Sequence, residues 1–154
     1  MAITPTPVNT ILDFMNLPSI VNLGVATNIG EPVVFQQLGD IKPTTSLVAT
    51  EPIGGHRIVK AVVGGCAYAD SSSISDINTV IGITESAYSI GDLVQIRLSG
   101  EVTEPSWNFN IGSVYLGING LLTQTIPTTG FLQQVGIATS SHIILINIKQ
   151  PIVI

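Results

Sequence analysis

Charged side chains are scarce in this sequence, since Asp, Glu, Lys and Arg make up 10% of its 154 residues. Soluble domains typically contain about 25% of these residue types. None of them occurs between Glu104 and Lys149. A free monomer usually keeps a charged coat for solubility. The scarcity therefore favours either a surface covered by partners or one wetted by the plentiful Ser, Thr, Asn and Gln.

Basic clusters and long apolar runs are missing as well. The five cations are scattered along the chain, and the net charge is −5. Direct nucleic-acid binding is not expected, because phosphate neutralisation requires clustered Lys and Arg. No run approaches the roughly 18 apolar residues of a membrane helix. The N-terminal MAITPTPVNT lacks the basic and apolar regions of a signal peptide. We therefore expect neither a nucleic acid nor a membrane as a partner.

Residues that carry catalysis are few. The single cysteine, Cys66, cannot form an internal disulfide and is predicted to be a small core residue. Neither His56 nor His142 has an arrangement typical of a catalytic base, and the serine-rich loop between Asp70 and Asp76 has too few ligands for calcium. Hydrolase, zinc-protease and phosphate-loop motifs are absent. We expect no enzyme activity, catalytic residue, cofactor or metal. A small cysteine-dependent hydrolase that uses Cys66 is kept as a distant alternative.

The first 55 residues differ from the rest, since six of the nine prolines interrupt their apolar runs. Thr10–Leu17 favours one or two helical turns with Thr10 as the N-cap. We predict that residues 1–55 form an extended Pro-rich arm that lies along other subunits. The alternative is that they add strands to the core. The candidate contact residues of the arm are Ile3, Val8, Ile11, Leu12 and Phe14.

Residues 56–154 show the pattern of an all-β domain. In LVQIRLSGEV the side chains of Val94, Ile96 and Leu98 alternate with polar residues, as in a half-buried strand. In VYLGI-NG-LLTQT, apolar runs flank Asn119-Gly120, a pair that can adopt the positive φ angles of a type I′ turn. The domain is therefore expected to be built of short strands and hairpins.

A weak internal repeat supports this expectation. IVKAVV-GG-CAYAD matches SVYLGI-NG-LLTQT, VIGIT matches QVGIAT, and a strand-like segment follows each copy. Two similar hairpin-plus-strand units predict a small barrel or sandwich with a pseudo-two-fold. Chance similarity between short strands is the alternative.

The segment HIILINI is apolar on both faces, with Ile144 and Ile146 on one and Ile143 and Leu145 on the other. Such a strand is expected in the centre of a sheet or at a subunit interface. Ile143 and Leu145 are the candidate interface residues. Trp107 and Phe109 lie between two strand-like segments. They are predicted to plug the end of the barrel, and stacking on a sugar or base is the alternative.

The segment GEVTEPSWNFNIGSVYLGINGLLTQTIPTTGFLQQVGIATSSHIILINIKQPIVI resembles a C-terminal module of structural proteins of tailed bacteriophages. GGHRIVKAV, AYAD, VIGIT and SIGDLVQIRLSG resemble the first half of that module. The short strands also resemble the small β-barrels of capsid cement proteins.

The resemblance implies a virion structural protein made in the cytoplasm of a bacterial host. A capsid decoration (cement) protein is the first expectation, and a tail or fibre component is the alternative. The implied partners are the major capsid protein and copies of the chain itself, as a homotrimer or alternatively a homodimer. The family has no catalytic residues to carry over, and residues 1–55 match nothing in it.

Overall fold

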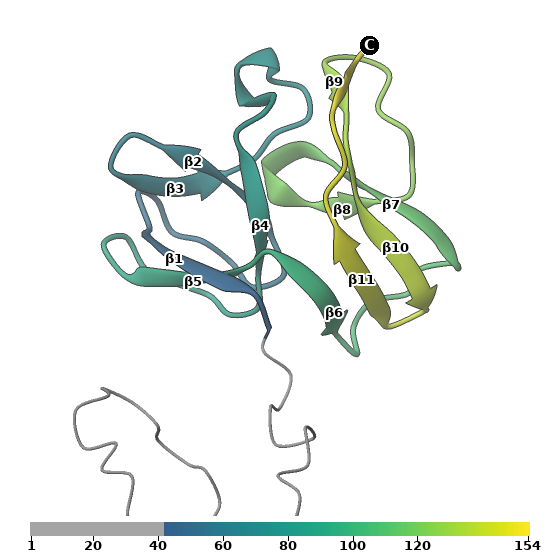
Figure 1. Cartoon of the computed structure of the whole chain (residues 1–154), viewed down its shortest axis with the longest axis horizontal. Coiled ribbons are helices and arrows are strands. Elements are labelled where there is room, and N and C mark those ends of the chain that lie inside the picture. Colours follow the sequence, from purple (N-terminus) through teal and green to yellow (C-terminus); the bar gives the residue numbers. More distant parts are fainter. Residues whose placement is uncertain (1–41) are drawn as a thin grey trace, which may run out of the picture. The chain divides into compact units, whose positions relative to one another are not determined.

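The computed structural model describes residues 42–154, which fold as short strands joined by turns (Figure 1). The elements in chain order are β1 (Thr44–Val48), β2 (Ile58–Val62), β3 (Gly65–Tyr68), η2 (Ile74–Asp76), β4 (Val80–Thr84), β5 (Leu93–Arg97), β6 (Ser99–Thr103), β7 (Gly112–Leu116), η3 (Ile118–Gly120), β8 (Leu122–Thr123), β9 (Phe131–Leu132), β10 (Gln134–Ser140), β11 (Ile143–Asn147) and β12 (Ile152–Val153). The η elements are single 3-10 turns. The predicted all-β class is confirmed for the described residues.

Two five-stranded antiparallel sheets make up most of this fold. The first sheet has the strand order β1-β5-β4-β2-β3, and the second has the order β6-β11-β10-β7-β8. The short strands β9 and β12 form a separate pair near the C-terminus. In Figure 1 the first sheet lies on the left, with β4 at its border toward the second sheet, and the second sheet lies on the right.

The first sheet curls until its two edge strands meet. A parallel bridge joins Ala49 to Cys66, and the amide of Thr50 donates to the carbonyl of Cys66 at 3.0 Å. At Gly65 a side chain would collide with the carbonyl of Val48, so only glycine allows this approach. The curled sheet encloses its own core, made of Ala49, Ile53, Val59, Cys66, Val94 and Ile96. The prediction that Cys66 is a small core residue is confirmed.

The second sheet covers the opposite face of the first. Ile58 and Ile83 point out of the curled sheet, and both side chains are fully buried. They belong to one apolar cluster with Val114, Ile144 and Ile146, which lie on one face of the second sheet. We call this the inner face of the second sheet. The main core of the protein thus lies between the two sheets.

The two sheets are structural repeats of each other. Replacing β1, β2, β3, β4 and β5 by β6, β7, β8, β10 and β11 converts the first strand order into the second. The irregularities also coincide. The register of β2 with β4 shifts between Val59 and Lys60, and the register of the equivalent pair, β7 with β10, shifts between Gln134 and Gly136. The repeat extends the one seen in the sequence by adding β1 and β6.

Equivalent glycines mark the same close contact in both repeats. A side chain on Gly82 would meet the carbonyl of Arg97, and one on Gly136 would lie 2.6 Å from the carbonyl oxygen of Leu145. These two glycines are aligned by VIGIT and QVGIAT, so the sequence match reflects a shared packing constraint.

The predicted hairpins are present, but their turns differ from the prediction. Asn119 and Gly120 both have positive φ, at 52° and 70°, yet they lie within a five-residue loop between β7 and β8 and do not form a two-residue turn. In the first repeat the turn is Val63-Gly64, one residue earlier than predicted, because Val62 pairs with Gly65. Gly64 has φ of 86°, as the third position of a type II turn requires.

The folded unit begins before the predicted boundary at residue 56. The compact unit spans Ile41–Ile154, and β1 pairs along its whole length with β5. Prolines flank β1 in the sequence, but they lie outside the paired residues, where a strand tolerates them. The predicted arm residues Ile3, Val8, Ile11, Leu12 and Phe14, and the helical turns at Thr10–Leu17, lie outside the described residues.

Strand β11 has neighbours on both sides, as predicted for a central strand. It pairs with β6 on one side and with β10 on the other. Ile144 and Ile146 are buried in the main core, whereas Ile143 is half-buried and Leu145 is exposed on the opposite face. We call this second face the outer face of the second sheet.

The glycine constraint predicts that Gly136→Ala lowers the free energy of unfolding by about 1–3 kcal/mol, because the added carbon overpacks a closed contact. Gly82→Ala should behave in the same way. Gly54→Ala is the control, since its new carbon would meet nothing closer than 3.4 Å. Urea denaturation measures all three variants, and a Gly136→Ala variant as stable as the control would contradict the constraint.

The placement of β11 predicts opposite outcomes for adjacent residues. Ile146→Asp should prevent folding or cost on the order of 3 kcal/mol or more, because it buries an unpaired carboxylate. Leu145→Asp should leave the fold intact, because Leu145 is exposed. Circular dichroism and thermal denaturation distinguish the two, and equal stability of the variants would show that β11 is placed incorrectly.

Candidate functional site

A cavity of about 320 Å³ gathers aromatic and ionisable side chains from distant parts of the chain. It is lined by Gly55, His56, Arg57, Glu104, Ser106, Trp107, Phe109, Leu121 and Leu122. The segment before β2 supplies His56 and Arg57, and the connection from β6 to β7 supplies Glu104, Trp107 and Phe109. The cavity is therefore built by both repeats.

His56 is the central group of this cavity. Its φ angle of 55° lies in the left-handed region, which is uncommon for residues other than glycine. The Nδ1 atom lies 3.2 Å from Oε2 of Glu104. The imidazole also meets the indole of Trp107 edge-on, with 5.3 Å between the ring centroids. These contacts join the first repeat to the second.

Glu104 is held by more than the histidine. Its Oε1 accepts a hydrogen bond of 2.8 Å from the amide of Ser106. Hydrogen bonds from the amide and hydroxyl of Ser106 lower the pKa of Glu104, burial opposes this, and His56 adds a smaller lowering. Among the described residues the close hydrogen bond from Ser106 to Glu104 comes from its amide, and no hydrogen bond joins its hydroxyl to the imidazole of His56, so these three residues do not have the arrangement of a catalytic triad.

Trp107 and Phe109 pack against the main core, and they also line the cavity. Their rings meet edge-on at 5.5 Å. The backbone carbonyl of Trp107 lies 2.6 Å from Nδ1 of His142, which fixes the connection against the turn between β10 and β11. The structure is compatible with both predicted roles of the aromatic pair, the plug and the stacking surface.

Cys66 is not in an environment that suits nucleophilic chemistry. Its side chain is fully buried in the core of the first sheet. Burial raises the pKa of the thiol, and the nearby Glu51 raises it further. Reactive cysteines need the opposite, an accessible thiol with a lowered pKa.

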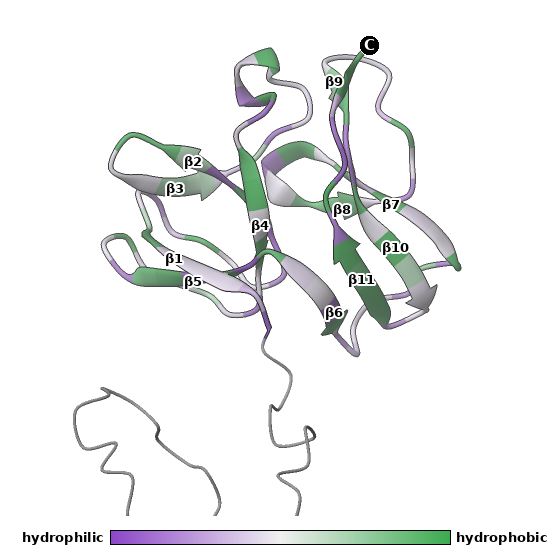
Figure 2. Ribbon diagram, viewed as in Figure 1, coloured by the Kyte–Doolittle hydropathy of each residue, from purple (hydrophilic) through white to green (hydrophobic). Residues whose placement is uncertain are grey.

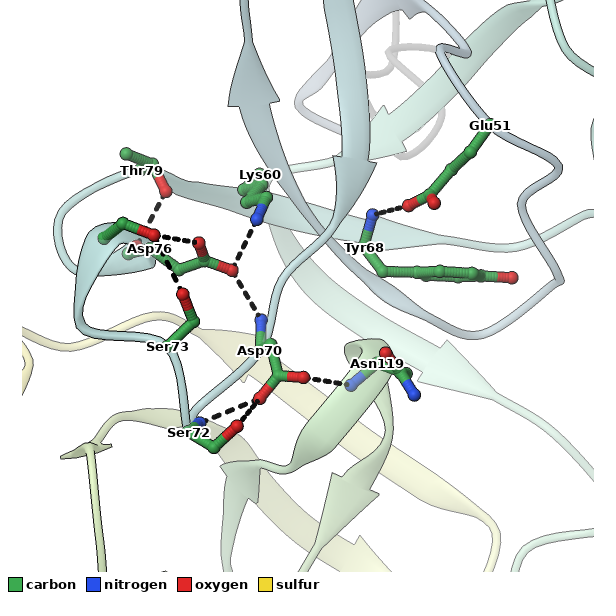
Figure 3. A network of polar contacts seen from close by, with 10 residues as sticks. Glu51, Lys60, Tyr68, Asp70, Ser72, Ser73, Asp76, Thr79 and Asn119 are labelled. Carbon is green, nitrogen blue, oxygen red and sulfur yellow. Dashed lines mark hydrogen bonds and ion pairs between the residues drawn. The ribbon is translucent and has the colours of Figure 1, made fainter.

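The two aspartates of the serine-rich loop, Asp70 and Asp76, have structural roles (Figure 3). Oδ2 of Asp76 lies 2.6 Å from Nζ of Lys60 and accepts the amide of Asp70 at 2.9 Å. Burial raises the pKa of Asp70, but hydrogen bonds from Ser72 and Asn119 and the charge of Lys60 lower it overall. Both carboxylates are thus engaged by hydrogen-bond donors of the chain itself. Among residues 42–154 no group of three or more His, Cys, Asp or Glu could hold a metal ion.

The same loop connects the two repeats through its backbone. The amide of Ser71 donates to the carbonyl of Gly117 at 3.1 Å, and the carbonyl of Ser71 accepts the amide of Phe131 at 2.9 Å. The Asp70–Asp76 network therefore holds a connection between the repeats.

The outer face of the second sheet carries the predicted interface residues. Leu145 is 45% exposed, and its cross-strand neighbour Ile137 is 43% exposed. Ile143 lies on the same face of β11 and is half-buried. Within β6, β7, β8, β10 and β11, Glu101 is the single charged residue. In Figure 2 most of β11 is green, whereas β10 alternates between green and pale segments. This face is therefore a nearly uncharged sheet surface.

A second cavity, of about 540 Å³, lies beside the β7–β8 hairpin. Ile118, Leu121 and Ile126 line it, and each is exposed by roughly half. No titratable side chain lines it. Half of its lining residues are Ser or Thr, so it offers both apolar contact and hydroxyl groups.

No protein-family model matches the chain, and no curated protein is detectably similar to it. The resemblance to the phage module therefore stays a prediction. Within residues 42–154, no helix has the length and apolarity needed to cross a membrane.

Sequence reasoning missed the His56–Glu104–Trp107 contact. Its members are distant along the chain, and neither His56 nor Glu104 belongs to a recognisable motif. The one available signal was the repeat, because it implies that the start of β2 and the end of β6 belong to neighbouring units.

The lowered pKa of Glu104 predicts a dependence of stability on pH. A carboxylate with a depressed folded-state pKa stabilises the fold above its unfolded pKa, and this contribution is lost as pH falls through the folded pKa. Glu104→Gln should therefore be less stable than the wild type near neutral pH, and the difference should shrink on acidification. Denaturation between about pH 3 and pH 7 measures it. Glu101→Gln, which removes an exposed carboxylate, is the control, and a difference independent of pH would contradict the prediction.

Proposed function

We propose that this chain is a structural component of a tailed-bacteriophage virion and acts as a capsid decoration (cement) protein. The observation that carries the proposal is the outer face of the second sheet, a broad surface with one charged residue in its strands. Interface cores are depleted of charge in the same way. The resemblance of residues 100–154 to phage structural modules supplies the biological setting.

The mechanism is mechanical. The chain binds an assembled shell and not its free subunits, so its binding energy adds to the stability of the assembly by linkage. The partners are the major capsid protein and copies of the chain itself. A position on a local three-fold axis would give a trimer, and one on a local two-fold axis would give a dimer. The N-terminal arm would extend the contact to neighbouring subunits.

A tail or fibre component is the alternative, and the cavity with Trp107 is the observation that favours it. An aromatic ring beside Glu104 and Arg57 is the combination that binds a sugar, through stacking and hydrogen bonds to hydroxyl groups. A cysteine-dependent hydrolase is disfavoured, because Cys66 is buried and the pKa of its thiol is raised.

Imaging of phage particles made with and without this chain tests the proposal. We expect added density on the head when the chain is present, and particles that lack it should lose their contents at lower temperature or lower salt. Density on the tail would favour the alternative. Absence of the chain from purified particles would contradict both.

The proposed role of the N-terminal arm is tested by a truncation. A chain without residues 1–20 should keep the melting temperature of the full chain, because the compact unit begins at Ile41. It should fail to attach to particles that lack the protein. A co-sedimentation assay with the full chain as control measures attachment, and attachment at full affinity would show that the arm is dispensable.

A further inference from the structure

One row of side chains crosses four strands on the outer face of the second sheet, and a matching row crosses the first sheet. In the second sheet the row is Ser113, Ile137, Leu145 and Glu101, in the strand order β7-β10-β11-β6. In the first sheet it is Ile58, Ile83, Arg97 and Thr44, in the order β2-β4-β5-β1. Because the registers agree, each residue of one row has a counterpart in the other.

The two rows differ in burial, and the row that contains a charged residue in its middle is the buried one. The row of the first sheet contains Arg97, which is 3% exposed because the second sheet covers it. Its counterpart Leu145 is 45% exposed. A buried arginine is unusual and requires partners, whereas one exposed leucine is ordinary. Leu145, however, lies beside the exposed Ile137, so the second row presents an apolar pair to the surroundings where the equivalent pair of the first row is buried.

The row is complementary to itself across a two-fold axis. If two outer faces meet with the axis parallel to the strands, the row of one copy runs opposite to the row of the other. Ile137 then lies against Leu145 of the second copy, and Glu101 lies against Ser113, whose hydroxyl can donate to the carboxylate. The two like charges are kept apart at opposite ends. A closed two-fold interface uses one surface patch in this way.

We propose that the outer face of β6, β11, β10 and β7 is the interface of a homodimer, with Ile137 of each copy packed against Leu145 of the other. This inference goes beyond the proposed function and holds whether or not the chain belongs to a virion. At the usual strand and residue spacings, four strands of about five residues give a face of about 19 Å by 17 Å. Such an area is small for a permanent dimer, so we expect association in the micromolar range.

Sedimentation velocity of the full chain over a wide concentration range tests the dimer. The wild type should shift from monomer to dimer as concentration rises, and the double variant Ile137→Glu/Leu145→Glu should stay monomeric. Ile90→Glu, which changes an exposed isoleucine of the first repeat, is the matched control and should dimerise like the wild type. A wild type that stays monomeric at every concentration, or one that forms trimers, would overturn the proposal.

Two further variants test the pairing itself and touch no buried residue. Ser113→Arg places a cation against Glu101 of the second copy and should tighten the dimer several-fold at low salt. Ser113→Glu places a second carboxylate there and should weaken it by a similar factor. Equal affinities for the two variants would overturn the two-fold arrangement. Neither measurement uses phage particles, so a failure of this proposal is distinguishable from a failure of the proposed function.

Discussion

The structure depends on the burial of one face of the first sheet beneath the second. Ile58 and Ile83 supply the apolar part of this contact, and both are fully buried. Arg97 lies beside them, with Nη2 2.5 Å from a carboxylate oxygen of Glu85 and Nη1 donating to the carbonyl of Glu101. A buried guanidinium without these partners would be strongly destabilising. The position of β6, which directly follows β5, is therefore fixed by charge as well as by packing.

The repeats share a backbone but have diverged in what they present to their surroundings. Lys60 and Tyr115 occupy equivalent positions beside the same register break, and so do Arg97 and Leu145. The first repeat uses its ionic groups inside the chain, where Lys60 holds the Asp76 loop and Arg97 holds β6. The second repeat has no such groups in these positions. The first repeat thus uses its ionic groups for internal contacts, and in the proposed dimer the second repeat provides the surface for association.

Part of this architecture could be predicted from local sequence. The alternation in Leu93–Arg97 and the match between VIGIT and QVGIAT predicted strands and a repeat, because burial on one face and a glycine in a close contact both leave local patterns. Strand β1 lies in the segment for which an arm was predicted and added strands were the alternative, and for this strand the structure shows the alternative. The exact turns were missed because loop length depends on the pairing of Val62 with Gly65 and of Leu116 with Leu122. The cavity around His56 was missed because it is formed by contacts between the repeats, which no local pattern encodes.

The scarcity of charge has a specific location in the fold. The stretch between Glu104 and Lys149 contains β7, β8, β10 and β11, so the absence of ionic groups is concentrated in the second sheet. Its inner face needs apolar residues to bury the first sheet, but its outer face has no such need within one chain. Selection for a soluble monomer would place charges there, because they carry no packing penalty on an exposed strand face. In the proposed dimer a second copy covers this outer face, and a self-complementary row would then account for the scarcity of charge along its strands.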